Sequence, residues 1–184
     1  MVERAQEPIV RERAVSVSPP AREPILALDI RPSMFGFAAL EGSSRLLDWG
    51  MRRIEKGKRP LRTAVTARIL PLLDFHRPGY VVVRSRNYHS AALNRRRATI
   101  VDSIRGESIR QSIKFRKLTT RQVRRQLLPG GSGTKYQIAA QMAKHFEALS
   151  WRLPHPRKPY QSESVAMLVF DAVAVGMAFL TLRE

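Results

Sequence analysis

Two aspartates lie within apolar segments of the sequence, where an ionised carboxylate is energetically unfavourable unless it has a structural or chemical role. Asp29 closes the short apolar run 25–30, and Asp171 lies in the middle of the nearly continuous apolar segment 165–182. A buried carboxylate is costly unless a cation, a hydrogen-bond donor or a metal ion compensates it. Asp29 is therefore either a turn or cap residue at a strand end or part of a site. Asp171 either has an arginine partner or contributes to a site.

Basic side chains gather in the middle of the chain. Residues 84–125 contain thirteen Lys or Arg and only two acidic residues. Arginine suits phosphate recognition because its guanidinium is flat and bidentate, and Tyr88 and Phe115 stand among the arginines as candidate stacking groups for bases. Three consecutive arginines on one helix point in different directions, so one or two of them would meet phosphate. The predicted nucleic-acid contacts from this region are Arg84, Arg86, Arg95, Arg96, Arg97, Arg121, Arg124 and Arg125.

Lys135 follows a glycine-rich loop, residues 129–133, and Thr134 can cap a helix that starts there. Backbone N–H groups at a helix start favour phosphate, so Lys135 joins the predicted nucleic-acid contacts. The loop lacks the Gly-Lys-Ser/Thr ending of a Walker A motif, and ATP binding is therefore not expected.

The composition favours a polyanionic partner. The 184 residues include 33 Lys or Arg against 15 Asp or Glu, which gives a net charge of +18 and an isoelectric point near 11.5. Such an excess attracts DNA or RNA. The chain has no cysteine, which excludes disulfides and cysteine-ligated zinc sites.

Neither end of the chain predicts membrane association. The N-terminal residues carry glutamates among arginines and have no apolar core, so no secretory signal is expected. The segment 165–182 just reaches transmembrane length, but Asp171 at its centre would be costly in lipid. We therefore expect a buried helix.

The length suits one domain of α/β class with a flexible tail over residues 1–24 and a folded domain over 25–184. The pattern predicts five strands, at 25–30, 34–40, 45–50, 80–83 and 112–118. It predicts helices at 61–75, 91–110, from Thr119 or Thr120 to 126, at 135–149, and from about Ser162 onward. Three strands come first along the chain and βα units follow. This order favours a mixed sheet with helices on both faces.

Three segments read together resemble the RuvC family of DNA junction nucleases, which have an RNase H-like fold. ILALDIRPSMFGFAAL resembles the family's first strand, which ends in a catalytic Asp before a Pro-containing turn and a Gly-bearing second strand. LTTRQVRRQLLPGGSGTKYQIAAQM resembles the segment in which an Arg-Gln-Val helix and a Gly-rich loop precede a Lys-led helix. FDAVAVGMAFL resembles the closing helix. The resemblance covers roughly residues 25–182.

The resemblance implies phosphodiester cleavage of branched DNA by two Mg²⁺ or Mn²⁺ ions held about 4 Å apart by carboxylates. Asp29 matches the first metal ligand and Asp171 the last. The resemblance also implies a homodimer acting on four-way DNA junctions. It places the protein in the bacterial cytoplasm, at the nucleoid, or in an organelle.

The chain departs from the family pattern at two ligand positions. Arg84 stands where the family carries a Glu at the end of the fourth strand, and Leu168 stands one helical turn before the last Asp, where the family has an acidic residue or His. Glu163 is the nearest substitute as a catalytic carboxylate. On a continuous helix it would lie about 12 Å along the axis from Asp171. It would therefore have to fold back from a non-helical start, or else it would simply complement the helix dipole.

An arginine at position 84 can pair with both aspartates and lower their attraction for Mg²⁺. Two alternatives therefore stay open: an active metal-dependent nuclease, and a catalytically inactive RNase H fold that binds DNA or RNA. A structural or RNA-associated basic protein without an active site is the competing class.

Overall fold

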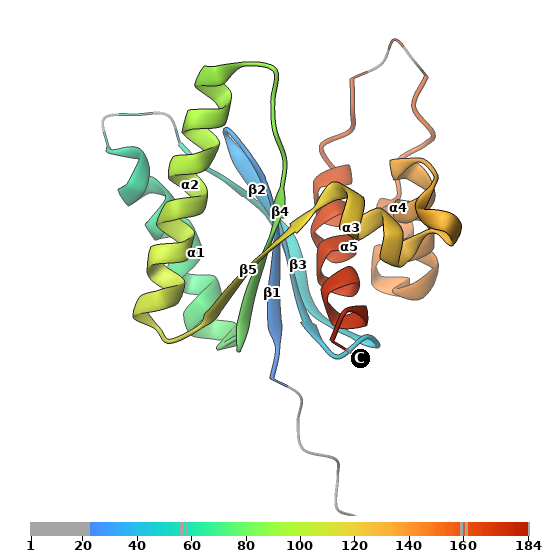
Figure 1. The fold of residues 1–184 in the computed structure, drawn as a ribbon, viewed down its shortest axis with the longest axis horizontal. Coiled ribbons are helices and arrows are strands. Elements are labelled where there is room, and N and C mark those ends of the chain that lie inside the picture. Colours follow the sequence, from blue (N-terminus) through green and yellow to red (C-terminus); the bar gives the residue numbers. More distant parts are fainter. Residues whose placement is uncertain (1–22, 56, 58, 159, 161, 184) are drawn as a thin grey trace, which may run out of the picture.

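A single mixed sheet of five strands organises the chain in the computed structural model, which describes residues 23–183 apart from 56, 58, 159 and 161 (Figure 1). Strands β1, β2 and β3 form an antiparallel meander, and β4 and β5 run parallel to β1, in the spatial order β3-β2-β1-β4-β5. The strand bounds are β1 Ile25–Arg31, β2 Met34–Glu41, β3 Arg45–Arg53, β4 Tyr80–Ser85 and β5 Lys114–Thr119. Apart from Glu23 and Pro24, the tail predicted at 1–24 lies outside the described residues.

Helices cover both faces of the sheet, as the sequence predicted. Figure 1 shows α1 and α2 on one face, and α3, α4 and α5 on the other. The helix bounds are α1 Leu61–His76, α2 Ala91–Arg110, α3 Thr120–Leu127, α4 Lys135–His145 and α5 Met167–Thr181, with short 3₁₀ turns at Pro129–Gly131 and Glu147–Arg152. Thr119 and Thr134 each cap the following helix in a capping box with a Gln three residues on, so both predicted caps are confirmed.

The side chains of β1 alternate between two hydrophobic clusters, one on each face of the sheet. Leu26 and Leu28 pack among residues of α1 and α2, whereas Ile25 and Ala27 pack among residues of α5 and its neighbours. Asp29 follows this alternation and belongs to the α5 face. The strand pattern therefore directs a carboxylate toward α5.

Helix α5 is buried throughout residues 167–180, because the sheet lies on one side of it and α3 and α4 pack on the other. Its central position explains why the sequence of this segment is apolar on every face. Among the described residues, no helix is both long and apolar enough to cross a membrane.

The structure moves three predicted boundaries. Helix α4 ends at His145 rather than 149, because Phe146 takes extended dihedral angles and its side chain enters the core. Strand β5 begins at Lys114 rather than 112, since Ser112 adopts a left-handed conformation with φ of 59° in the preceding turn. Helix α5 begins at Met167 rather than near Ser162, which leaves the residues around Glu163 outside the helix.

Candidate functional site

Three charged side chains meet at the carboxyl ends of β1 and β4. These strands are parallel neighbours with Leu28 beside Val83, so the next residues along, Asp29 and Arg84, also lie side by side. Asp171 comes from the early part of α5, which covers this face of the sheet. All three residues are buried, with exposed fractions of 0% for Asp29 and 4% each for Arg84 and Asp171.

Arg84 joins the two aspartates. Its Nε donates a hydrogen bond to Asp29 Oδ1 at 2.7 Å, and its Nη1 donates to Asp171 Oδ1 at 3.1 Å. Burial alone would lower the pKa of the Arg84 guanidinium, but the charges of Asp29 and Asp171 and their hydrogen bonds raise it above its ordinary value. Arg84 is therefore a fixed cation between two carboxylates. The pairing predicted from the sequence is confirmed.

Lys135, the first residue of α4, brings a second cation to Asp171. Its Nζ lies 2.5 Å from Asp171 Oδ2 and 2.5 Å from Glu163 Oε1. Burial raises the pKa of Asp171 above its ordinary value, the charges of Arg84 and Lys135 oppose this rise, and the charge of Asp29 adds to it. The ammonium of Lys135 is thus engaged within the protein, and a phosphate contact at this residue would have to share it.

Glu163 lies four residues before α5 and points back toward Asp171. Since Lys135 Nζ lies 2.5 Å from one oxygen of each residue, these two carboxylate oxygens are no more than 5.0 Å apart. Arg31 Nη2 donates to the other Glu163 oxygen, Oε2, at 2.7 Å. Burial raises the pKa of Glu163, but the hydrogen bond from Lys135 and the charges of Lys135, Arg31 and Arg86 together lower it below its ordinary value. The expectation that Glu163 occupies the first turn of the helix is wrong, because the helix starts later.

These contacts form a sequence of alternating charges, which we name the ion-pair chain. Three carboxylates are balanced by three cations, so the chain as a whole is neutral. Its members in order are Arg31, Glu163, Lys135, Asp171, Arg84 and Asp29. Sequence reasoning missed Arg31 and the pairing of Lys135, because each pairs with a residue distant in the sequence and no local pattern links them.

The arrangement does not fit a magnesium or manganese centre. Mg²⁺ needs near-octahedral oxygen coordination, and the described residues contain no group of three or more Asp, Glu, His or Cys side chains able to hold a metal ion. Arg84 and Lys135 stand beside the carboxylates that would supply the oxygens. Leu168, one turn before Asp171, is buried and apolar. Asp29 Oδ2 and Asp171 Oδ2 accept no hydrogen bond from the described residues, but Asp171 Oδ2 lies 2.5 Å from the Lys135 ammonium, which stands where a metal ion would have to bind.

Three of the predicted DNA-contacting arginines, Arg84, Arg96 and Arg97, donate hydrogen bonds to oxygens of the protein. Arg97 is 9% exposed, and its guanidinium donates to the carbonyl oxygens of Ile30, at 3.3 Å from Nε, and of Arg84. Arg96 Nε donates to the Pro32 carbonyl at 2.6 Å. The expected phosphate contacts of Arg84 and Arg97 are therefore corrected, because both guanidinium groups are buried and bond protein oxygens. Arg96 and Arg97 hold α2 against the end of β1.

The other predicted arginines remain accessible around the same edge of the sheet. Helix α2 follows β4 and α3 follows β5, so both helices begin where the parallel strands end. A cavity of about 410 Å³ opens between Arg121, Arg125 and the adjoining glycines of the 129–133 loop. Arg86 is half-buried, with its guanidinium 6.0 Å from the ring centroid of Tyr88. The exposed members are Arg95, Arg121, Arg124 and Arg125.

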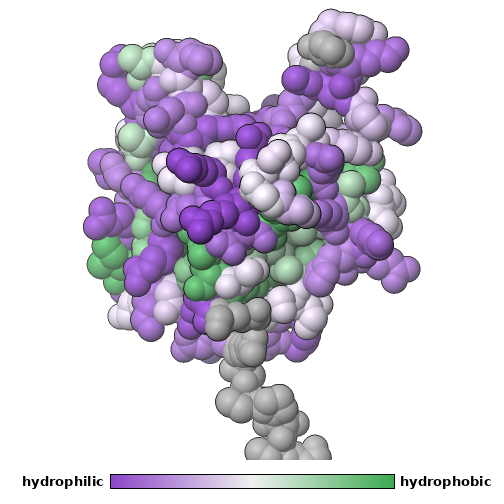
Figure 2. Space-filling view, turned by 45° about the vertical axis from the view of Figure 1, so that its right-hand side comes forward, coloured by the Kyte–Doolittle hydropathy of each residue, from purple (hydrophilic) through white to green (hydrophobic). Residues whose placement is uncertain are grey.

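The space-filling view shows the shape of this edge. Two protrusions rise from the molecule with a hollow between them, and hydrophilic side chains cover most of the hollow (Figure 2). The right-hand protrusion belongs to the segment that connects η2, the 3₁₀ turn Glu147–Arg152, to α5. The edge of the sheet is therefore recessed and polar, flanked by exposed arginines.

Solved structures of RuvC and of a Holliday junction resolvase share this fold. Thermus thermophilus RuvC in complex with Holliday junction substrate superposes with a TM-score of 0.70 at 16% identity, over 88% of this chain and 95% of that one. A second T. thermophilus RuvC structure gives 0.68 at 16% identity, over 87% and 95% of the two chains. The yeast mitochondrial Holliday junction resolvase Ydc2 gives 0.60 at 10% identity, over 90% and 80%. These likenesses confirm the predicted RNase H-like fold.

Sequence comparison adds nothing to this likeness. No protein-family profile matches the chain, and no curated protein matches its sequence.

Proposed function

We propose that this chain is a divergent RuvC-like protein that binds branched or duplex DNA at the carboxyl edge of its sheet and does not hydrolyse it. The observation that carries the proposal is the charge of the site: its carboxylates are neutralised by Arg84, Lys135 and Arg31, and exposed arginines surround them. A phosphate that approaches this edge meets a neutral interior and a positive rim. An edge of this kind attracts phosphate without needing a metal ion.

The exposed arginines would supply most of the binding free energy. Each contact between an arginine and a phosphate releases counterions from the DNA, and these contacts carry no base specificity. Arg95 on α2 and Arg121 on α3 lie on opposite faces of the sheet. Contacts from both would fix a duplex arm across the hollow, and a branched substrate offers more than one such arm.

Homodimer formation belongs to the proposal as well. A second copy would present a second recessed edge, and two edges match the several arms of a branched substrate. The oligomeric state is tested by sedimentation of the protein alone and with a four-way junction. We expect a complex of two chains per junction.

One binding and cleavage experiment tests the function. The protein is incubated with end-labelled four-way junction, linear duplex and RNA of equal length, each with EDTA, Mg²⁺ or Mn²⁺. We expect retention of the junction and duplex in EDTA, tightest for the junction, and intact strands under every condition. Strand cleavage that requires Mg²⁺ or Mn²⁺ would overturn the inactive site, and preference for RNA would overturn the choice of DNA.

A further inference from the structure

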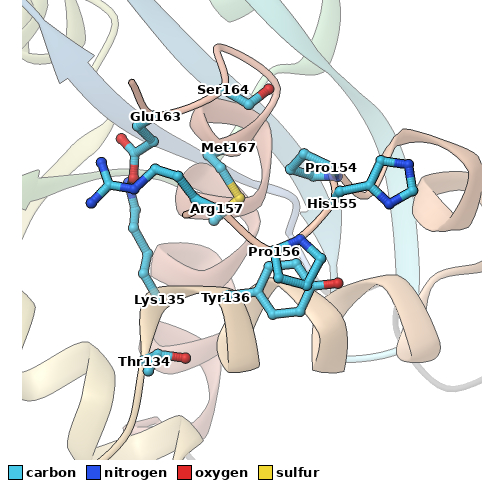
Figure 3. A pocket seen from close by; sticks show the side chains of 10 residues that line it. All are labelled: Thr134, Lys135, Tyr136, Pro154, His155, Pro156, Arg157, Glu163, Ser164 and Met167. Atoms are coloured by element: carbon cyan, nitrogen blue, oxygen red, sulfur yellow. The ribbon is translucent and has the colours of Figure 1, made fainter. Parts of the chain in front are cut away.

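A cavity of about 520 Å³ opens directly beside the ion-pair chain, between the start of α4 and the segment that leads into α5 (Figure 3). Lys135 and Glu163, two members of the chain, form part of its lining. This size lies within the roughly 300–1,000 Å³ range of small-molecule sites. The cavity is therefore large enough for one planar aromatic ring system, such as a nucleobase, and it adjoins the proposed DNA-binding edge.

Two parts of the lining differ in chemistry. One part is apolar and aromatic, and consists of Tyr136, Met167, Pro154 and Pro156. Figure 3 shows Tyr136 and Pro156 on one side of the cavity and Met167 deeper within it. Aromatic and apolar surfaces of this kind stack on the faces of nucleobases without regard to sequence.

The other part of the lining carries charge. Figure 3 shows Lys135, Arg157 and Glu163 together along one side. Arg157 is exposed and makes no hydrogen bond or ion pair within the described part of the chain, so its charge is available to an anion. The Glu163 carboxylate can accept a hydrogen bond from an exocyclic amino group, as the polar edges of bases require.

We infer that this cavity binds the base of an unpaired nucleotide, with Tyr136 stacked on the base and Arg157 on its phosphate. A nucleotide combines a flat aromatic group with an anion, which matches the two parts of the lining. A paired base enters only after its pairing and stacking energy is spent, whereas an unpaired base costs less to extrude, so the cavity favours disrupted DNA over intact duplex. The inference rests on the proposed DNA-binding function and specifies the feature of branched DNA that the site would select.

The experiment compares two duplexes that differ at one position. The first has a single unpaired 2-aminopurine, and the second has an abasic sugar in its place, so both carry the same phosphates and differ by one base. The wild type should bind the 2-aminopurine duplex about 5- to 150-fold more tightly, as expected for one stacked base. The fluorescence of 2-aminopurine should change on binding, because the base leaves the DNA stack and stacks on Tyr136.

Matched variants assign the preference to the cavity. Tyr136→Ala should abolish the preference for the unpaired base, and Tyr136→Phe should keep it. Trp151→Ala removes an aromatic residue that is 72% exposed and not part of the lining, and should leave the preference unchanged. Arg157→Ala, at an exposed position, should weaken binding of the 2-aminopurine duplex more than binding of fully paired duplex.

The outcomes separate this inference from the proposed function. A wild type that binds none of these DNAs contradicts the proposed function. A wild type that binds both duplexes equally, or a folded Tyr136→Ala that keeps the preference, overturns the inference and leaves DNA binding intact. If Tyr136→Ala does not fold, the Arg157→Ala comparison decides, and equal weakening of both DNAs overturns the inference.

Discussion

Gly36 packs against the backbone of Leu168, where β2 meets α5. A Cβ added at position 36 would lie 2.3 Å from the Leu168 carbonyl oxygen, a distance that real atoms do not adopt. Gly36 is also the β2 residue paired with Asp29 in the β1–β2 ladder. The absence of a side chain at this position therefore lets α5 approach the sheet closely enough for Asp171 to reach Arg84.

Gly36→Ala should destabilise the protein by about 1–3 kcal/mol, because the added methyl group must push α5 away from the sheet. Gly106→Ala is the matched control: no atom lies within 4 Å of a Cβ built there, and alanine in α2 should stabilise by about 0.5–1 kcal/mol. Urea unfolding of both variants measures the difference. Equal effects of the two changes would contradict the close contact.

Arg84→Met should cost about 3–5 kcal/mol of unfolding free energy, because it leaves two buried carboxylates without their shared cation. Arg95→Met, at an exposed position on α2, should change stability by less than about 0.5 kcal/mol. Denaturant unfolding near neutral pH checks both values. A small loss of unfolding free energy in Arg84→Met would mean that Lys135 alone balances the charge of the buried carboxylates.

Replacing both cations that touch Asp171 should expose a latent metal site. Arg84→Glu combined with Lys135→Gln removes two positive charges and adds an oxygen ligand beside Asp29 and Asp171. Mg²⁺ should then raise the melting temperature of the double variant, since a ligand that binds the folded state stabilises it. Mg²⁺ should leave the melting temperature of the wild type unchanged. A wild type stabilised by Mg²⁺ would contradict the view that Arg84 and Lys135 replace metal ions.

Glu163 should make stability depend on pH. Its pKa is lower in the folded protein than in the unfolded chain, so its contribution is present above the unfolded value, near 4.3, and is lost as pH falls through the folded value. Glu163→Gln should therefore destabilise by about 1 kcal/mol at neutral pH. The difference from wild type should vanish in acid. Urea unfolding at a series of pH values measures it, and a difference that grows on acidification would contradict the ion pairs to Lys135 and Arg31.

The sheet could be predicted from the sequence because its strands carry strong local patterns. The apolar run of β1 and the β-branched residues of β4 are typical of buried central strands, and their parallel pairing places Asp29 beside Arg84. That pairing made the contact between Arg84 and the aspartates predictable. The ends of α4 and α5 were not predictable, because Phe146 and the residues after Ser162 continue an acceptable helical pattern.

The rest of the ion-pair chain could not be predicted from local pattern. Arg31 and Glu163 are 132 residues apart in the sequence and meet only because α5 starts late enough for Glu163 to turn back. The burial of the Arg97 side chain could not be predicted either, because nothing in the sequence distinguishes it from its neighbours Arg95 and Arg96. Its carbonyl partners, Ile30 and Arg84, belong to different strands. Tertiary contacts decide which charges face the solvent.

The salt dependence of DNA binding should report which arginines touch phosphate. Each phosphate contact contributes about 0.9 to the slope of log affinity against log salt concentration, so affinity should fall steeply as salt rises. Arg121→Ala removes an exposed guanidinium beside the cavity that it forms with Arg125, and should reduce the slope by about 1. Arg110→Ala removes another exposed arginine, but Arg110 lies at the far end of α2 and pairs with Glu107, so the slope should not change. Fluorescence anisotropy with a labelled four-way junction at several salt concentrations measures the three slopes. A flat response of the wild type would reject nucleic-acid binding, and equal losses from the two variants would reject the placement of the binding surface at the carboxyl edge of the sheet.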